Sequence, residues 1–318
     1  EPEEGAWEEG PLKEYSKMVD DLLSRGIRPM VTLHHFSHPH WWEDKGGFSN
    51  AENIPDFVRY CDRVHAALSD RVKVWCTINE PVVFSSMGYA LGQFPPGKRS
   101  ITQTVLVMKN MMVAHSKVYN LLKSKDKDSS IGFAKNVTLF DPTNRWSPLD
   151  WAASRLLDWI WNGAWRRAIQ KGRMFGSNIE GAKSSLDFIG LNYYTHFVTG
   201  LFVPTATSEL DFQKRDNEVE TDFGYPMYAE GFRRAIEYAS AFGVPIEVTE
   251  NGVADASDSL RPEHLKRHLW ILSEAIKNGY DVRSFHYWSL MDNFEWAEGY
   301  SMRFGLYEVN YGDQSRSL

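Results

Sequence analysis

Short apolar runs alternate with amphipathic stretches along this 318-residue chain. We interpret six of the apolar runs as strands, which cover residues 29–35, 72–78, 131–137, 187–193, 246–250 and 282–288. The stretches whose apolar residues recur at helical spacing predict helices over residues 11–25, 54–68, 101–122, 149–169, 227–242 and 263–278. Strands that alternate with helices in this way are typical of a parallel sheet covered by helices. The pattern therefore predicts an α/β fold.

The alternation continues through the whole chain. No linker, charge block, low-complexity tract or internal repeat interrupts it, and single α/β barrels commonly reach this length. We therefore expect residues 1–318 to form a single catalytic barrel domain.

Two glutamates stand at the ends of predicted strands. Glu80 follows the run 72–78 and precedes Pro81, and Glu250 ends the run 246–250 and precedes Asn251-Gly252. In a (β/α)8 barrel the carboxyl ends of the strands carry the catalytic groups. Two carboxylates that face each other there are the machinery of glycoside hydrolysis. A single glutamate would be weak evidence, but two in this setting form a specific signal.

Six segments together resemble the signatures of one family. They are TLHHF (32–36), TINEP (77–81), DFIGLNYY (187–194), VTENG (248–252), WSLMDNFEW (288–296) and GYSMRFGL (299–306). In sequence and in order they are similar to glycoside hydrolase family 1, the retaining β-glycosidases. The resemblance covers nearly the whole chain.

The resemblance implies a (β/α)8 TIM barrel of which about six of the eight strands are present. The segment at residues 1–5 resembles the family's loop after its second strand, and residues 307–318 stop short of its last helix. We therefore expect a partial barrel that lacks the N-terminal part and the extreme C-terminus. The family's glutamine and arginine from the first two strands would be missing with that part.

The resemblance also implies the catalytic roles. Glu80 corresponds to the general acid/base, which protonates the leaving oxygen and later activates water. Glu250 corresponds to the ionised nucleophile, which forms a covalent glycosyl-enzyme. Retention of configuration requires the two carboxyl groups to lie ~5–5.5 Å apart. The alternative for either glutamate is a surface or helix-capping carboxylate.

Further positions match residues that bind the sugar or support the nucleophile. Asn79 would bind the sugar 2-hydroxyl, although such an amide can also satisfy a loop backbone. His35 would bind another hydroxyl, whereas His34 has the opposite strand parity and should point away from the site. Tyr194 resembles the hydrogen-bond donor to the nucleophile, with Asn192 as a supporting partner. The platform and hydroxyl clamp of the sugar correspond to Trp288, Glu295 and Trp296.

The implied reaction is hydrolysis of terminal non-reducing β-D-glucosides, with β-galactosides or β-fucosides as related substrates. Glu295 would repel a phosphate at the 6-position, which favours unphosphorylated sugars. The alternatives are a catalytically inactive truncated family member and a sugar-binding pseudoenzyme. The presence of both Glu80 and Glu250 counts against the pseudoenzyme. The aglycone and the oligomeric state are left open.

The composition of the chain limits the classes of partner and cofactor that we expect it to bind. The formal charge of −7 argues against a nucleic-acid surface and suits a neutral small-molecule substrate. The two cysteines, Cys61 and Cys76, form no disulfide framework, and no spacing indicates a metal site or another cofactor. We see no apolar stretch long enough to span a membrane and no signal peptide. These features predict a cytoplasmic enzyme, unless a signal preceded residue 1.

Overall fold

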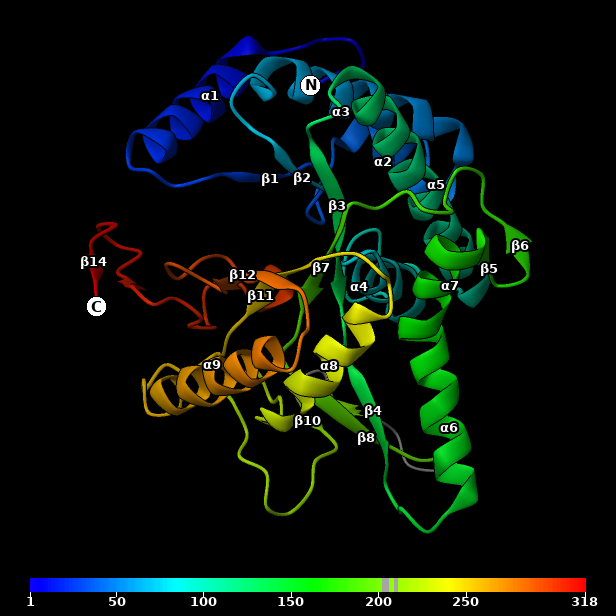
Figure 1. Cartoon of the computed structure of the whole chain (residues 1–318), viewed down its shortest axis with the longest axis vertical. Coiled ribbons are helices and arrows are strands. Elements are labelled where there is room, and N and C mark those ends of the chain that lie inside the picture. The colour runs from blue at the N-terminus through cyan, green and yellow to red at the C-terminus, as the bar shows by residue number, and fades with distance from the viewer. Residues whose placement is uncertain (202–205, 209–210) are drawn as a thin grey trace. The chain divides into compact units, whose positions relative to one another are not determined.

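A computed structural model describes residues 1–201, 206–208 and 211–318, and its elements are labelled in Figure 1. The chain divides into two compact units. Unit 1 comprises residues 1–135 and 167–190, and unit 2 comprises residues 136–166 and 191–318. The single-domain assignment of residues 1–318 stays a prediction.

Six strands form the parallel sheet of the described chain. They are β1 (Met30–Thr32), β2 (Val74–Asn79), β3 (Ser130–Asn136), β7 (Phe188–Asn192), β11 (Ile246–Asn251) and β12 (Val282–Tyr287). Their order in the sheet is β1-β2-β3-β7-β11-β12, which is also their order in the chain. The β1–β2, β2–β3 and β11–β12 pairs are parallel. The six predicted strands are thus confirmed, as is the α/β fold of the TIM-barrel type with six strands present.

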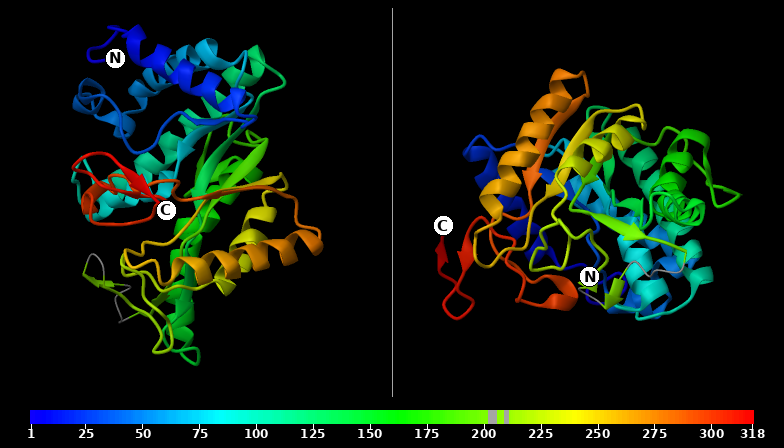
Figure 2. Two further views of the ribbon diagram at one scale, coloured as in Figure 1. Left: turned by 90° about the vertical axis from the view of Figure 1, so that its left-hand side faces the viewer. Right: turned by 90° about the horizontal axis from the view of Figure 1, so that it is seen from below.

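Unit 1 is built on three long helices, which are α1 (Glu9–Ser24), α3 (Ile54–Leu68) and α5 (Ile101–Lys125). The helix α1 lies beside α3, as the left-hand view of Figure 2 shows. The apolar faces of α3 and α5 share one core, in which Phe57 and Leu68 pack with Val107 and Met111. The apolar residues whose helical spacing predicted these helices also fill this core.

Unit 2 combines a second parallel strand pair with helices. The pair is β4 (Leu139–Pro142) with β8 (His196–Thr199). Residues 149–169, predicted as one helix, fall in α6 (Pro148–Asp158), a π-helical turn at residues 159–163 and α7 (Ala164–Lys171). The helices α8 (Glu230–Ser240) and α9 (Arg261–Lys277) lie side by side.

Short elements complete the two units. They are α2 (His40–Asp44), the 3-10 turns Gly47–Ser49, Ala51–Asn53 and Trp296–Glu298, α4 (Pro81–Ser85), the π-helical Ser86–Leu91, β5 (Arg173–Met174), β6 (Ser177–Asn178), β9 (Ala206–Ser208), β10 (Asp211–Phe212), β13 (Glu308–Val309) and β14 (Arg316–Ser317). Most of them follow the carboxyl ends of parallel strands. The turn Trp296–Glu298 contains the predicted site residue Trp296, and α4 begins directly after Glu80.

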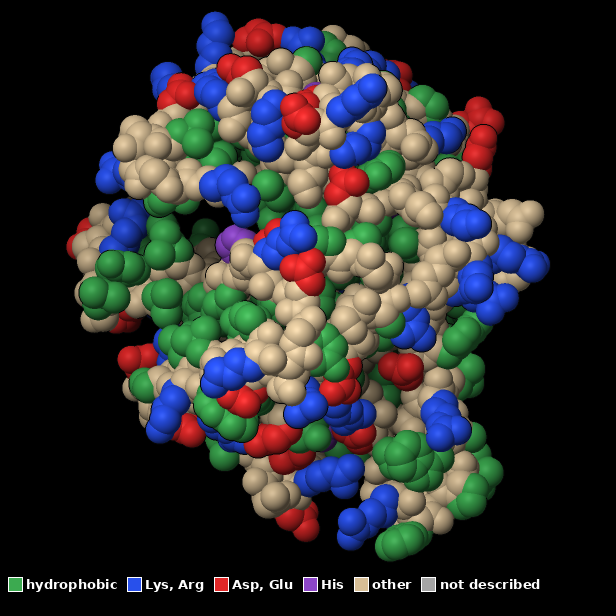
Figure 3. Space-filling view, in the orientation of Figure 1, with side chains coloured by type: hydrophobic (Ala, Val, Ile, Leu, Met, Phe, Trp, Pro, Cys, Tyr) green, Lys and Arg blue, Asp and Glu red, His purple; other side chains and the backbone are tan. Residues whose placement is uncertain are grey.

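The surface carries charges of both signs. Figure 3 shows basic and acidic side chains interspersed over the visible face, without a large area of one sign. Within the described residues, none of the helices is both long enough and apolar enough to cross a membrane.

Candidate active site

Glu80 follows the last residue of β2 and is buried, with 6% of its surface exposed. Its backbone is in the left-handed region at φ 42°, ψ 57°. The backbone N–H of Glu80 donates to the Ala134 carbonyl at 2.9 Å, and its own carbonyl accepts from Phe84 in α4 at 3.0 Å. A left-handed non-glycine residue costs about 1–2 kcal/mol, and such strain clusters at functional sites. The strand end and the helix that begins at Pro81 therefore hold the Glu80 backbone in a set position.

His35 and Asn79 lie together at the ends of β1 and β2. The Asn79 Nδ2 atom is 3.0 Å from His35 Nε2, and the Asn79 backbone N–H donates to the His34 carbonyl at 2.8 Å. Burial lowers the pKa of His35 to about 4, so its ring is neutral at ordinary pH. His34 packs edge-on against the rings of Phe48 and Phe84. The expected opposite orientations of the two histidines stay a prediction.

Glu250 and Tyr194 are brought together in unit 2. The Tyr194 hydroxyl donates to Glu250 Oε2 at 2.6 Å. The Glu250 carbonyl also accepts from the Tyr193 backbone N–H at 3.0 Å, which links the end of β11 to the chain that follows β7. Glu250 is buried, with 8% of its surface exposed. A short bond from a phenol stabilises the charged form of a carboxylate.

Asn192 is the last residue of β7, and its Oδ1 accepts a hydrogen bond from Thr249 Oγ1 at 2.5 Å. Thr249 immediately precedes Glu250 on β11. This bond therefore fixes the register of the two strand ends on the side opposite Glu250. Sequence reasoning assigned Asn192 a supporting role but did not identify Thr249, although alternation along β11 places its side chain on the other face.

Trp288 follows β12, and its backbone N–H donates to the Asn251 carbonyl at 3.0 Å. A side chain at Gly252 would collide with the Trp288 carbonyl. Only glycine allows this close approach, which explains the glycine of the Glu250-Asn251-Gly252 segment. The Trp288 ring packs against a buried cluster of Ala254, Met302 and Phe304.

Glu295 and Trp296 lie on the loop after β12, where the Glu295 backbone N–H donates to the Gly299 carbonyl at 2.7 Å. This loop is fixed at its base by Asp292, whose carboxylate accepts from Arg303 at 2.8 Å and from the Gly305 backbone at 2.9 Å. Asp292 and Arg303 therefore act as structural supports of this loop. These contacts support the loop that carries Glu295 and Trp296. The sugar-binding roles of both residues stay predictions.

Among the described residues, no cluster of three or more His, Cys, Asp or Glu side chains could hold a metal ion. The predicted site residues lie at or just beyond the carboxyl ends of parallel strands, except for Glu295 and Trp296, which lie further along the loop after β12. One strand end presents a buried carboxylate next to a histidine–asparagine pair, and another presents a carboxylate bonded to a phenol. Such groups can donate a proton, attack an electrophilic carbon and bind hydroxyls.

The sequence profile of glycosyl hydrolase family 1 matches residues 2–318. The chain belongs to glycosyl hydrolase family 1. As a member of this family it is an O-glycosyl hydrolase, and the sequence-based resemblance is confirmed.

Similar proteins agree with the family assignment. The family 1 chain is 32% identical over 330 residues to the β-glucosidase A of Thermotoga maritima, covering 95% of this chain and 73% of that protein. It is 31% identical over 345 residues to the β-galactosidase of Pyrococcus woesei, covering 93% and 67% respectively. The solved structure of a β-glycosidase from Pyrococcus horikoshii superposes with a TM-score of 0.90 at 36% identity, covering 99% of this chain and 74% of that one.

Proposed function

We propose that this family 1 protein hydrolyses terminal non-reducing β-D-glucosides, and also β-galactosides or β-fucosides, with retention of configuration. The substrate class rests on the names of the similar β-glucosidase and β-galactosidase. The observation that carries the mechanism is the 2.6 Å hydrogen bond from Tyr194 to Glu250. A nucleophilic carboxylate must be ionised, and a phenol that donates to it favours this form.

In the first step Glu250 attacks the anomeric carbon while Glu80 transfers its proton to the glycosidic oxygen. The bond to the aglycone breaks, the aglycone leaves as an alcohol, and the sugar is joined to Glu250 as an ester. In the second step the Glu80 carboxylate takes a proton from water as the water oxygen attacks the same carbon. Glu250 leaves as the carboxylate, and Glu80 is again protonated. Two inversions at one carbon result in net retention.

The strand-end groups around these carboxylates would bind the glycone. Asn79 hydrogen-bonds the sugar 2-hydroxyl, His35 binds another hydroxyl, and Glu295 accepts from two adjacent hydroxyls. Trp288 and Trp296 pack against the apolar face of the ring. Since a phosphate would be repelled by Glu295, the preferred glycone is unphosphorylated.

A 2-deoxy-2-fluoro-β-glucoside with a good leaving group tests the assignment. The fluorine slows the second step, so the covalent sugar should accumulate and be found by peptide mass spectrometry on Glu250. Proton NMR of early hydrolysis of an ordinary glucoside should show the β-anomer first. The variant E250Q should not be labelled, whereas E247Q, at a buried carboxylate on the same strand β11, should be labelled as the parent is. Labelling of another residue, or an α-anomer as the first product, would refute the mechanism. Binding of sugar without turnover would favour the pseudoenzyme.

We also propose a cytoplasmic location. Cys61 is a free, buried thiol, and burial raises its pKa, which keeps it protonated and unreactive. Free thiols of this kind are typical of a reducing compartment. Fractionation of cells followed by immunoblotting should place the protein with cytosolic markers, and its recovery with the exported proteins would contradict the proposal.

A further inference from the structure

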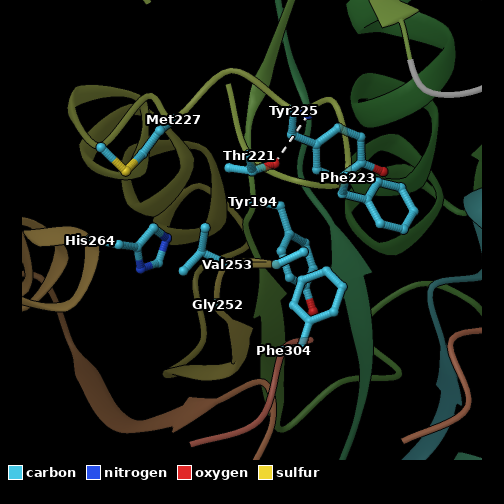
Figure 4. Close-up of a pocket in the computed structure, with 10 residues that line it drawn as sticks. Tyr194, Thr221, Phe223, Tyr225, Met227, Gly252, Val253, His264 and Phe304 are labelled. Carbon is cyan, nitrogen blue, oxygen red and sulfur yellow. Dashed lines mark hydrogen bonds between the residues drawn. The ribbon is translucent and has the colours of Figure 1, made fainter. Parts of the chain in front are cut away.

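Phe304 lies against the ring of the tyrosine that contacts the nucleophile. The rings of Tyr194 and Phe304 meet edge to face, with centroids 6.1 Å apart and an interplanar angle of 80°, and Figure 4 shows them next to each other. Phe304 is buried, with 4% of its surface exposed. Edge-to-face contacts of this kind orient aromatic rings. Phe304 therefore limits where the Tyr194 ring can lie.

A small cavity adjoins the same tyrosine. Its wall includes Tyr194 and Phe304 together with Thr221, Met227, Val253 and His264. Its free volume is about 10 Å³, which is room for about one water molecule. His264 is buried, and within the described residues neither of its ring nitrogens has a hydrogen-bond partner.

Hydrogen bonds hold the backbone around Phe304 in place. The Ser289 N–H donates to the Phe304 carbonyl at 3.2 Å, and the Asp255 N–H donates to the Arg303 carbonyl at 3.0 Å. Arg261, itself buried, donates to the same Arg303 carbonyl and to the Asp255 carbonyl. These bonds join the Phe304 segment to the loops that follow β11 and β12. Phe304 is thus a fixed wall for the phenol ring.

We infer that Phe304 is a positioning residue for the reaction, which acts through Tyr194 on Glu250. This inference rests on the proposed function. With Phe304 in place, the phenol is held at hydrogen-bond distance from Glu250 Oε2. Without it, the ring can tilt into the enlarged cavity, and the hydrogen bond that stabilises the Glu250 carboxylate lengthens.

The test is the pH dependence of kcat/KM for an aryl β-glucoside. Loss of a hydrogen bond to the charged form raises the pKa of a carboxylic acid. The acidic limb of the profile, which reports ionisation of the nucleophile, should move upward by ~0.5–1 pH unit in F304A. The value of kcat/KM at the optimum should fall about tenfold, since small displacements of catalytic groups slow reactions strongly. F304Y, which keeps the ring, should retain the parental profile.

Two further variants separate positioning from simple stability. Met302 belongs to the same buried cluster, so M302A should lower the melting temperature without moving the acidic limb. Y194F should move the limb at least as far as F304A does, and the double variant Y194F/F304A should show no further shift. An unmoved limb in F304A, with a moved limb in Y194F, would overturn this inference alone. An unmoved limb in Y194F would overturn the proposed role of the Tyr194–Glu250 bond and this inference with it.

Discussion

Asn79 and His35 are joined side chain to side chain, with 3.0 Å between the Asn79 Nδ2 and the His35 Nε2. An amide nitrogen can only donate, so His35 accepts at Nε2 and carries its proton on Nδ1. This tautomer is neutral, in agreement with the burial that lowers the pKa of His35 to about 4. The two strand ends thus present a neutral, mutually oriented pair, as binding of uncharged hydroxyls requires.

Asn79 should contribute mainly in the transition state. N79A is expected to lower kcat/KM for an aryl β-glucoside by about 100-fold, because hydrogen bonds to the 2-hydroxyl strengthen there by several kcal/mol. The matched substrate is the corresponding 2-deoxyglucoside, which lacks the hydroxyl in question. Parent and N79A should differ by less than about threefold on that substrate. Equal losses on both substrates would show that Asn79 acts on something other than the 2-hydroxyl.

The two glutamates should differ in how they respond to added anions. E250A is expected to lose hydrolysis of an aryl β-glucoside, and azide or formate should restore turnover to a product of inverted configuration. E80A should still form the glycosyl-enzyme from substrates with good leaving groups, and azide should accelerate the second step to a product of retained configuration. NMR of the glycosyl azides distinguishes the two. Near-parental rates in both variants would disprove the assignment.

His115 should make the protein sensitive to mild acid. Its Nδ1 lies 2.7 Å from Thr77 Oγ1 and its Nε2 lies 2.7 Å from the Ser185 carbonyl, and burial lowers its pKa to about 4. The unfolded chain binds this proton near pH 6.5, but the folded chain does not until about pH 4. The free energy of unfolding should therefore be unaffected above pH 6.5. Between pH 6.5 and 4 this histidine should lower it by a total of about 3 kcal/mol.

Urea denaturation at a series of pH values measures this effect. H115Q should be less stable than the parent at pH 7, because the replacement disturbs both hydrogen bonds. Its stability should fall less steeply between pH 6.5 and 4. H40Q, at an exposed histidine, is the control and should keep the parental slope. A parental slope in H115Q would show that His115 is not a source of acid sensitivity.

Asp292 should be important for stability. Its side chain is 2% exposed and receives hydrogen bonds from Arg303 and from the backbone of Gly305 and Val309. D292N should lower the free energy of unfolding by about 2–3 kcal/mol, since charged hydrogen bonds to buried groups are lost. The control is D281A, which removes an exposed ion pair with Arg283 and should cost less than about 0.5 kcal/mol. Similar losses in both variants would contradict this reading of Asp292.

Much of the fold could be predicted from periodicity. The helix predicted over residues 54–68 is α3 with the same bounds, and the strand predicted over 246–250 is β11 with one more residue. Both predictions are correct because, in each element, the apolar residues recur with the same spacing as the residues of the face that is buried. The predicted helix 149–169 is interrupted by a π-helical turn. A π-helical turn keeps the apolar character of its neighbours, so hydrophobic pattern does not reveal it.

Other features could not be predicted from the sequence because they depend on contacts with residues far along the chain. The parallel β4–β8 pair joins residues 139–142 to residues 196–199, and neither run has a strong alternating pattern. Tryptophans occur in both environments: Trp75 and Trp165 are buried, whereas Trp146 and Trp270 are 82% and 65% exposed. Residue type does not separate these cases, because burial is set by what packs on top.

The sequence by itself determined the family, the order of strands and helices, and the identity of the groups at the strand ends. Those properties are local, since a strand that ends in Asn79-Glu80-Pro81 presents its carboxylate at the strand's carboxyl end wherever the strand lies. Only the tertiary structure decided which groups touch: the phenol of Tyr194 on Glu250, Thr249 on Asn192, and Phe304 against the ring of Tyr194. Each of these contacts joins segments distant in sequence, and a few tenths of an ångström determine whether a hydrogen bond forms. No local pattern encodes such a distance, because it results from the packing of all the elements between.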